Sequence, residues 1–189
     1  RVGSQMKKIL DIHGHLGNIN FVPFWSADAD KLAVYCKESG VSKLCLSASR
    51  AIMYDVREGN AELDAALKSH DEFYGYLVVS PTFPDSLKDL VYLKSNKKFR
   101  GIKVHPDYNG YDLSVPSNFR FIDAVLKKTP MALFHCSCMP GSGYSPLATI
   151  AELARRNPKT KIVAAHGAGL FQNGNYPFFP NLDSLEREA

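Results

Sequence analysis

Short apolar runs recur along this chain at intervals of about thirty residues, the length of one strand-helix-strand unit. Repetition on this scale restricts the fold more than any other feature of the sequence. The runs are short and are bounded by Gly, Pro or Ser, which is typical of buried parallel strands. Six of them can be followed, at residues 8–13, 43–47, 74–79, 101–105, 131–135 and 161–166.

Segments with helical patterning separate these runs, at residues 28–38, 61–70, 86–93, 118–128 and 146–156. Four of them follow a residue that can cap a helix, namely Ser26, Asn60, Asp85 and Ser117, and the fifth opens with Pro146 in its first turn. Alternating elements of this kind predict an α/β protein with parallel strands, either an open doubly wound sheet or a closed barrel. No GxGxxG motif follows the first run, which argues against a nucleotide-binding open sheet.

A complete barrel needs eight such units in roughly 250 residues. The chain has 189 residues, which accommodate about six. We therefore expect an α/β fold of the TIM-barrel type with about six of its eight units. Residues 6–189 are expected to form this single, incomplete barrel domain. Residues 1–5 are expected to be a remnant ahead of a native start at Met6, because an apolar run follows at once and no signal peptide precedes it.

The composition restricts the kinds of molecule that this chain is expected to bind. The net charge is only +4, and no run of like charges marks a surface for nucleic acid or membrane. No apolar stretch is long enough to span a bilayer. The four cysteines lack the paired CxxC spacing of a structural zinc site, so we expect reduced thiols in a cytoplasmic protein. A small molecule is the expected partner.

Five of the six histidines lie at or just past the carboxyl ends of the predicted strands: His13, His15, His105, His135 and His166. Barrel enzymes carry their chemistry at this end. A single histidine there is more often structural, but packing alone does not explain five at equivalent positions.

The first strand carries two of these histidines in the sequence Asp-Ile-His-Gly-His. A strand's period of two predicts that His13 and His15 face the barrel interior together with Asp11, while Leu10 and Ile12 face the helices. Two imidazoles on one face can bind one metal ion, and Asp11 could accept a hydrogen bond from one of their ring N–H groups.

Six motifs follow one another along nearly the whole chain, at residues 11–15 (DIHGH), 55–60 (DVREGN), 101–106 (GIKVHP), 134–136 (FHC), 145–156 and 165–167 (AHG). HxH alone is a weak signal, but its combination with GIKxHP and two later strand-end histidines is specific. Taken in this order, the motifs resemble the amidohydrolase superfamily and specifically its amidohydrolase-2 branch.

The resemblance implies an enzyme with one divalent metal ion per chain, zinc being the first expectation. It assigns His13, His15 and His135 as metal ligands and His166 as the residue that handles protons. Three protein ligands leave an open position where a water can be activated to hydrolyse a small carboxylated or cyclic substrate. Other members of the branch use the same site for nonoxidative decarboxylation or hydration, which remains the alternative.

Further functional residues are expected near the carboxyl ends of the predicted strands. Lys103 and His105 share one face of the fourth strand. Lys103 is expected to act in catalysis as an electrostatic stabiliser of a substrate anion, with a buried structural ion pair as the alternative. His105 is expected to contact the substrate or to be structural. Arg57 is expected to clamp a substrate carboxylate, and Trp25 to line an apolar wall.

The family pattern normally ends with an aspartate on an eighth strand, and the sequence supplies none. Three explanations stay open: a shortened gene product, a partner chain or second copy that completes the barrel, or a catalytically silent fragment that only binds. A six-stranded barrel would expose two strand edges, which favours self-association or a partner.

Overall fold

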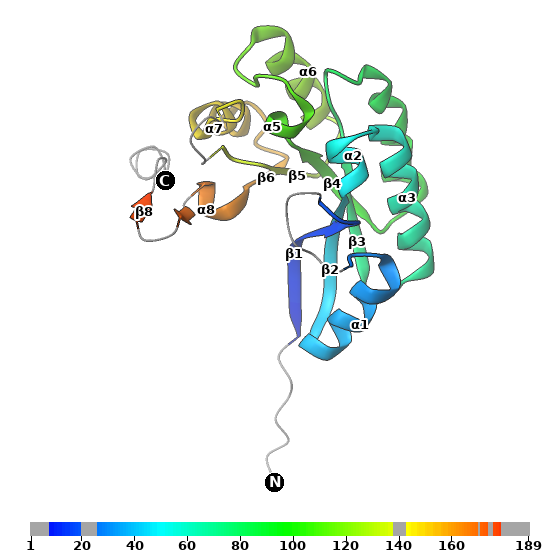
Figure 1. Ribbon diagram of the computed structural model, residues 1–189. Helices are drawn as coiled ribbons and strands as arrows, with labels where there is room; N and C mark the ends of the chain where they lie inside the picture. The colour runs from blue at the N-terminus through cyan, green and yellow to red at the C-terminus, as the bar shows by residue number, and fades with distance from the viewer. Residues whose placement is uncertain (1–7, 20–25, 138–142, 170, 174–175, 179–189) are drawn as a thin grey trace.

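The computed structural model describes residues 8–19, 26–137, 143–169, 171–173 and 176–178. Six parallel strands form one sheet in sequential order, and Figure 1 shows the sheet curled into a half-barrel with helices outside it. The predicted α/β fold of TIM-barrel type, with six units, is confirmed. The strands are β1 (Ile9–Leu16), β2 (Val41–Ala48), β3 (Phe73–Val78), β4 (Phe99–Val104), β5 (Met131–Phe134) and β6 (Lys161–Ala164).

The connections between the strands are mostly helical. Beyond β6, the short strands β7 (Phe171–Asn173) and β8 (Tyr176–Phe178) pair with each other in antiparallel fashion, separately from the main sheet. The helices are α1 (Ala29–Ser39), α2 (Ser49–Met53), α3 (Val56–Ser69), the 3-10 helix η1 (Pro84–Val91), α4 (Tyr92–Ser95), α5 (Pro106–Asn109), α6 (Pro116–Leu126), α7 (Leu147–Arg156) and α8 (Ala165–Gly169).

The helices begin at other residues than those predicted. Helix α1 is capped by Asp28, whose carboxylate accepts from the Lys31 N–H at 3.0 Å, and not by Ser26. Helix α3 starts earlier, after Asp55, which accepts from the Glu58 N–H at 2.9 Å. The first part of the segment at 86–93 is a 3-10 helix without a side-chain cap, and α6 begins at Pro116 instead of following Ser117.

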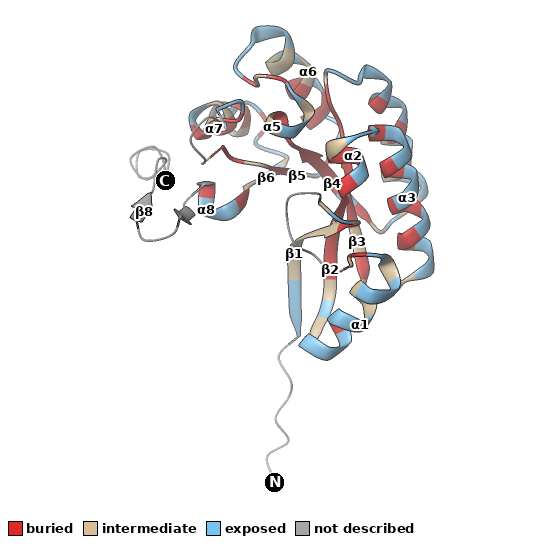
Figure 2. Ribbon diagram, in the orientation of Figure 1, coloured by how far each residue is buried: buried red, intermediate tan, exposed pale blue. Residues whose placement is uncertain are grey.

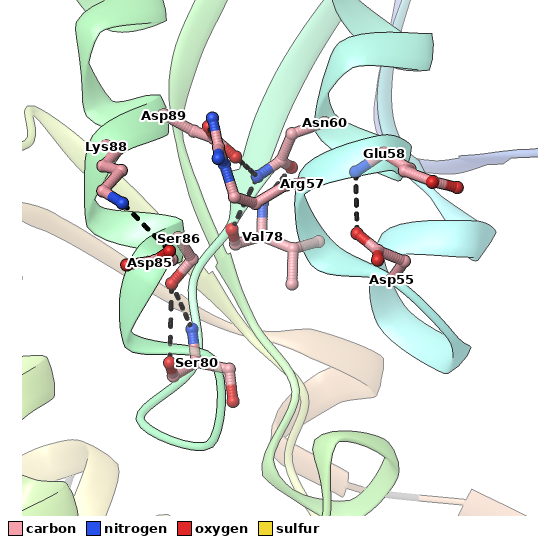
Figure 3. A network of polar contacts seen from close by, with 10 residues as sticks. All are labelled: Asp55, Arg57, Glu58, Asn60, Val78, Ser80, Asp85, Ser86, Lys88 and Asp89. Carbon is pink, nitrogen blue, oxygen red and sulfur yellow. Dashed lines mark hydrogen bonds and ion pairs between the residues drawn. The ribbon is translucent and has the colours of Figure 1, made fainter.

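Asn60, predicted as a cap, is instead a fully buried link between three elements (Figure 3). Its amide donates to the Val78 carbonyl at 2.9 Å and to Asp89 at 3.0 Å, and its carbonyl accepts from the Val78 N–H at 2.9 Å. Arg57 pairs with the same Asp89 at 3.2 Å. Helix α3 is thereby fixed to β3 and to η1 by polar contacts that complement the apolar core.

The two faces of the sheet are packed differently. On the outer face, residues such as Leu46, Leu77 and Ile102 are completely buried against the helices, and Figure 2 shows this buried layer along the strands. The inner face carries a hollow of about 500 Å³ near the amino ends of the strands. Its lining is mostly apolar and includes Leu10, Ile12, Cys45, Tyr74, Tyr76 and Met131, with Arg100 and Lys161 beside them.

A β-bulge interrupts β1 between Asp11 and Gly14, at the first of its two histidines. Asp11 pairs with Leu44 and Gly14 with Leu46, so three steps along β1 match two along β2. The bulge places Ile12 and His13 on the same inner face. The prediction that Leu10 and Ile12 face the helices is therefore wrong, because both line the inner hollow.

The bulge also determines what Asp11 and Gly14 do. The Asp11 carboxylate accepts from the backbone N–H of His13 at 3.0 Å. It therefore stabilises the bulge, and this bond is to the backbone and not to a ring N–H. Gly14 lies on the outer face, where an added Cβ would come within 2.8 Å of the Leu44 side chain. The glycine between the two histidines allows β1 to approach the outer core.

The edges of the sheet are β1 and β6, each of which pairs with a single neighbour within the described residues. Leu10 and Ile12 on β1 are correspondingly exposed. Among the described helices, none has both the length and the apolar character needed to cross a membrane. No disulfide joins any cysteines that the structure describes.

Candidate active site

The five predicted histidines meet at the carboxyl edge of the half-barrel. The ring centroid of His13 lies 5.3 Å from that of His15 and 5.1 Å from that of His166. His135 lies 5.1 Å from His166 and 4.0 Å from His105. Strands that are distant in sequence therefore contribute one continuous cluster of imidazoles.

Lys103 lies beneath this cluster with a fully buried side chain. Burial lowers its pKa to about 7, so the neutral amine is accessible near physiological pH. Its Nζ lies 3.1 Å from Nε2 of His13. No carboxylate of the described residues lies within ion-pair distance of Nζ, so the amine faces imidazoles and not a counter-charge.

Four histidines of the cluster, His13, His15, His105 and His166, have lowered pKa values and are neutral at pH 7. Burial, followed by the charge of Lys103, lowers the pKa of His13 to about 3 and that of His15 to about 4. Burial, followed by the neighbouring His135, lowers the pKa of His166 to about 4, and burial holds the pKa of His105 well below its usual range. Neutral imidazole is the form that binds metal ions.

Two ring nitrogens of the cluster are buried without a hydrogen-bond partner, Nδ1 of His15 and Nδ1 of His135. A buried, unpaired polar atom costs about 1–3 kcal/mol, so such atoms point to a ligand. The hydroxyl of Ser47, the neighbour of His15 across β1 and β2, is also buried and unpaired. In chemistry this donor set fits a divalent ion.

The donor atoms are of the right chemical type for a metal ion, but they do not converge on one point. Among the described side chains, no three from His, Cys, Asp or Glu already converge as a metal site. His13 directs Nε2 to Lys103, and His135 directs Nε2 to the carboxylate of Asp107 at 3.1 Å. Ring rotations are therefore needed before three of these side chains can share one ion.

Asp107 is a residue of the site that sequence reasoning missed. Its carboxylate accepts from the Ser137 hydroxyl at 2.7 Å and from the Tyr144 N–H at 3.1 Å, in addition to its contact with His135. Burial alone would raise the pKa of Asp107, but hydrogen bonds from His135 and Ser137 outweigh this effect and lower it to about 2. Its position directly after the GIKVHP motif is the only signal that the sequence offered.

His105 is enclosed between aromatic rings. It stacks on Tyr108 at 4.2 Å and on His135 at 4.0 Å, and its Nδ1 accepts from the Tyr108 N–H at 3.4 Å as the cap of α5. These contacts match the structural alternative, and a contact with substrate stays a prediction.

His166 occupies a strained turn at the end of β6. His166, Gly167 and Ala168 all have left-handed backbone angles, with φ of 57°, 57° and 59°. Such a conformation is costly for the two residues that carry a Cβ, and strain of this kind concentrates at functional sites. The turn directs an exposed imidazole toward His13 and His135.

The remaining predicted contacts are not joined to the cluster. Arg57 lines a separate surface hollow with Asp55, Thr82 and Phe83, where it pairs with Asp89 (Figure 3). Its role as a carboxylate clamp stays a prediction. Trp25 lies outside the described residues.

The half-barrel, its strand-end histidines and its buried lysine define a protein of the amidohydrolase class. The family model described as Amidohydrolase matches residues 56–180, well over half of the chain. This chain therefore belongs to the amidohydrolase family, in its amidohydrolase-2 group. No curated protein matches the sequence significantly.

Solved structures share the fold at low sequence identity. A probable 2-pyrone-4,6-dicarboxylic acid hydrolase from Acinetobacter baumannii, solved with citric acid, matches 97% of this chain and 67% of its own, with a TM-score of 0.63 and 16% identity. An IDCase from Metarhizium anisopliae matches 86% and 66%, with a TM-score of 0.60 and 12% identity.

A 5-carboxyvanillate decarboxylase from Novosphingobium aromaticivorans, solved with manganese and a nitrobenzoic acid ligand, matches 74% of this chain and 49% of its own, with a TM-score of 0.57 and 16% identity. The chain thus spans between about half and two thirds of the length of these three structures. Both hydrolases and decarboxylases share its fold.

Proposed function

We propose that this chain carries the metal-binding part of a hydrolase of the amidohydrolase-2 type, which acts on a small carboxylated or cyclic substrate. The observation that carries the proposal is the cluster of imidazoles at the carboxyl edge of the sheet, in which the ring nitrogens Nδ1 of His15 and Nδ1 of His135 are buried and unpaired. Zinc is the first expected ion, because imidazole nitrogen suits it.

In this proposal His13, His15 and His135 hold the ion. When bound, a divalent ion would supply Lewis-acid chemistry and make a water nucleophilic near neutral pH. The residues around it have separate tasks. His166, neutral and exposed, takes up a proton and passes it to the leaving group.

Lys103 supports a negatively charged substrate. Its amine is buried beside His13 without a carboxylate partner among the described residues, so a substrate anion would meet little competition for it. Carboxylated compounds are favoured for this reason, and the names of the similar structures, a dicarboxylic acid hydrolase and a carboxyvanillate decarboxylase, agree with that choice.

The first test is the metal content of the purified chain by elemental analysis. We expect about one divalent ion per chain after supplementation and its loss in the double variant His13→Ala, His15→Ala. His70→Ala is the matched control, because His70 binds Asp30 and the end of α3 away from the cluster. Retention of the ion by the double variant would refute the assignment of ligands.

Nonoxidative decarboxylation or hydration on the same site is the second candidate. The decarboxylase among the similar structures favours it, since it shares the fold and was solved with manganese. Product analysis separates the candidates: carbon dioxide released from a carboxylated aromatic compound indicates a decarboxylase, whereas an opened ring or cleaved amide indicates a hydrolase.

A catalytically silent fragment is the remaining alternative. Absence of a bound ion together with a cooperative thermal transition would support it. A second copy or a partner that completes the barrel is a separate explanation, favoured by the exposed Leu10 and Ile12 and by the edges of β1 and β6, each paired with one neighbour within the described residues. We also propose a cytoplasmic location, with which the buried cysteines Cys36, Cys45 and Cys136 agree.

A further inference from the structure

Asp107 carries the one carboxylate that lies within hydrogen-bond distance of a ring of the histidine cluster among the described residues. It lies in the first turn of α5, directly after β4, and its side chain is only 9% exposed. Its Oδ2 lies 3.1 Å from Nε2 of His135 and 2.7 Å from the Ser137 hydroxyl. Its Oδ1 accepts from the N–H groups of Gly143 at 3.3 Å and Tyr144 at 3.1 Å.

These contacts determine where the ring of His135 carries its hydrogen. A carboxylate can only accept, so the hydrogen between Asp107 and His135 must sit on Nε2. In a neutral ring the lone pair then lies on Nδ1. That atom is buried and has no hydrogen-bond partner, as expected for a nitrogen kept for a ligand.

The ring has further support on both sides. His105 stacks on His135 with an angle of 12° between the ring planes, and the His135 backbone carbonyl accepts from the Ser145 hydroxyl at 2.5 Å. Ser145 also donates its N–H to the Ser137 hydroxyl at 2.8 Å, and that hydroxyl donates to Asp107. A closed chain of hydrogen bonds therefore leads from the His135 backbone back to its own ring.

We propose that Asp107 is a positioning residue that holds the Nε2–H of His135, so that Nδ1 is the atom this histidine offers to the metal ion. The inference rests on the proposed metal-binding function. The same carboxylate accepts hydrogen bonds from Ser137, Gly143 and Tyr144, and thereby links these three residues to the orientation of the ring. Acceptors of this kind typically strengthen metal binding 10–100-fold.

The experiment has two readouts. The ring tautomer of His135 is measured by nitrogen-15 NMR in the chelator-treated wild-type protein, where we expect Nε2–H. The dissociation constant for Zn²⁺ is then measured by chelator competition in wild type, Asp107→Asn and Asp107→Glu. We expect roughly 10–100-fold weaker binding for Asp107→Asn, with partial recovery in Asp107→Glu.

The matched control is Asp123→Asn. Asp123 is equally buried, with 8% of its side chain exposed, but it binds Lys127, Arg156 and Asn157 away from the site. This variant should leave the zinc affinity within about twofold of wild type, since it removes only a structural acceptor.

The outcomes separate the two proposals. A wild-type protein that binds no zinc refutes the proposed function, and with it the role of Asp107. Zinc binding by wild type with an unchanged affinity in Asp107→Asn overturns the role of Asp107 alone. An Nδ1–H tautomer in wild type also overturns it, and this measurement requires no variant to fold.

Discussion

The inner face of the sheet is divided into two layers that share the same strands and differ in chemistry. The histidine layer, at the carboxyl end, consists of His13, His15, Lys103, His135 and His166. The apolar layer, at the amino end, consists of Leu10, Ile12, Cys45, Tyr76 and Met131.

The difference teaches how the fold separates stability from chemistry. In the histidine layer, buried ring nitrogens lack partners and the pKa values of basic groups are lowered, which costs folding free energy. In the apolar layer, burial of Tyr76 and Cys45 contributes folding free energy, whereas Leu10 and Ile12 are exposed. The two layers should therefore respond in opposite ways to substitution.

The largest effect is expected for Tyr76→Ala in the apolar layer. Tyr76 is 1% exposed, and its removal leaves a cavity between the strands, so the free energy of unfolding should fall by about 3–5 kcal/mol. Denaturant titration measures this loss. Tyr76→Phe, the control, should lose about 1 kcal/mol or less, because the hydroxyl bonds to sulfur atoms, Sδ of Met131 at 3.9 Å and the thiol of Cys45, which are weak hydrogen-bond partners. A small loss in Tyr76→Ala would contradict the division into layers.

A smaller effect, visible as a pH dependence, is expected from Lys103→Met in the histidine layer. The unfolded chain holds the lysine proton up to about pH 10.5, whereas the folded chain releases it near pH 7. Wild-type stability should therefore rise with pH above about 7, by at most about 1.4 kcal/mol per unit, which is at most about 3 kcal/mol between about pH 7 and 9. The variant should lose this rise and should be the more stable protein near pH 7.

Urea titrations at several pH values between about 7 and 9 measure the slope for Lys103. Lys161→Met serves as the control, because Lys161 projects from the same face of the sheet but is exposed. If Lys103→Met keeps the wild-type slope, the amine is charged in the folded protein and has a counter-charge.

The smallest effect is expected for Arg57→Ala, outside both layers. The arginine side chain is 53% exposed, so its ion pair with Asp89 should contribute about 1 kcal/mol or less to stability. Zinc affinity should not change. A higher KM for a carboxylated substrate in this variant, at unchanged stability, would instead show that Arg57 reaches the substrate.

Much of this arrangement could be predicted from local sequence. The six strands lie within a few residues of the apolar runs, because each run is bounded by residues that interrupt regular structure. The histidines meet because carboxyl ends of parallel strands share one edge. Neither inference requires knowledge of which residues pair between strands.

The wrong or missing predictions concern positions where strand pairing and side-chain packing determine the structure. The bulge in β1 depends on its register with β2, so a simple period of two misplaced Leu10 and Ile12. Asp55 and Asn60 can both cap a helix, and only the contacts of α3 with β3 select Asp55. Asp107 gave no periodic signal, since its partners come from a loop about thirty residues later.

The bulge in β1 also has a consequence for how the two layers communicate. Ile12 and His13 are adjacent in the chain and lie on the same face, so a single peptide bond crosses the boundary between them. A further strand or a second molecule that covers Ile12 would contact a residue bonded directly to His13. A contact made at the amino end of the strands would thus reach the histidine layer through the backbone of one residue.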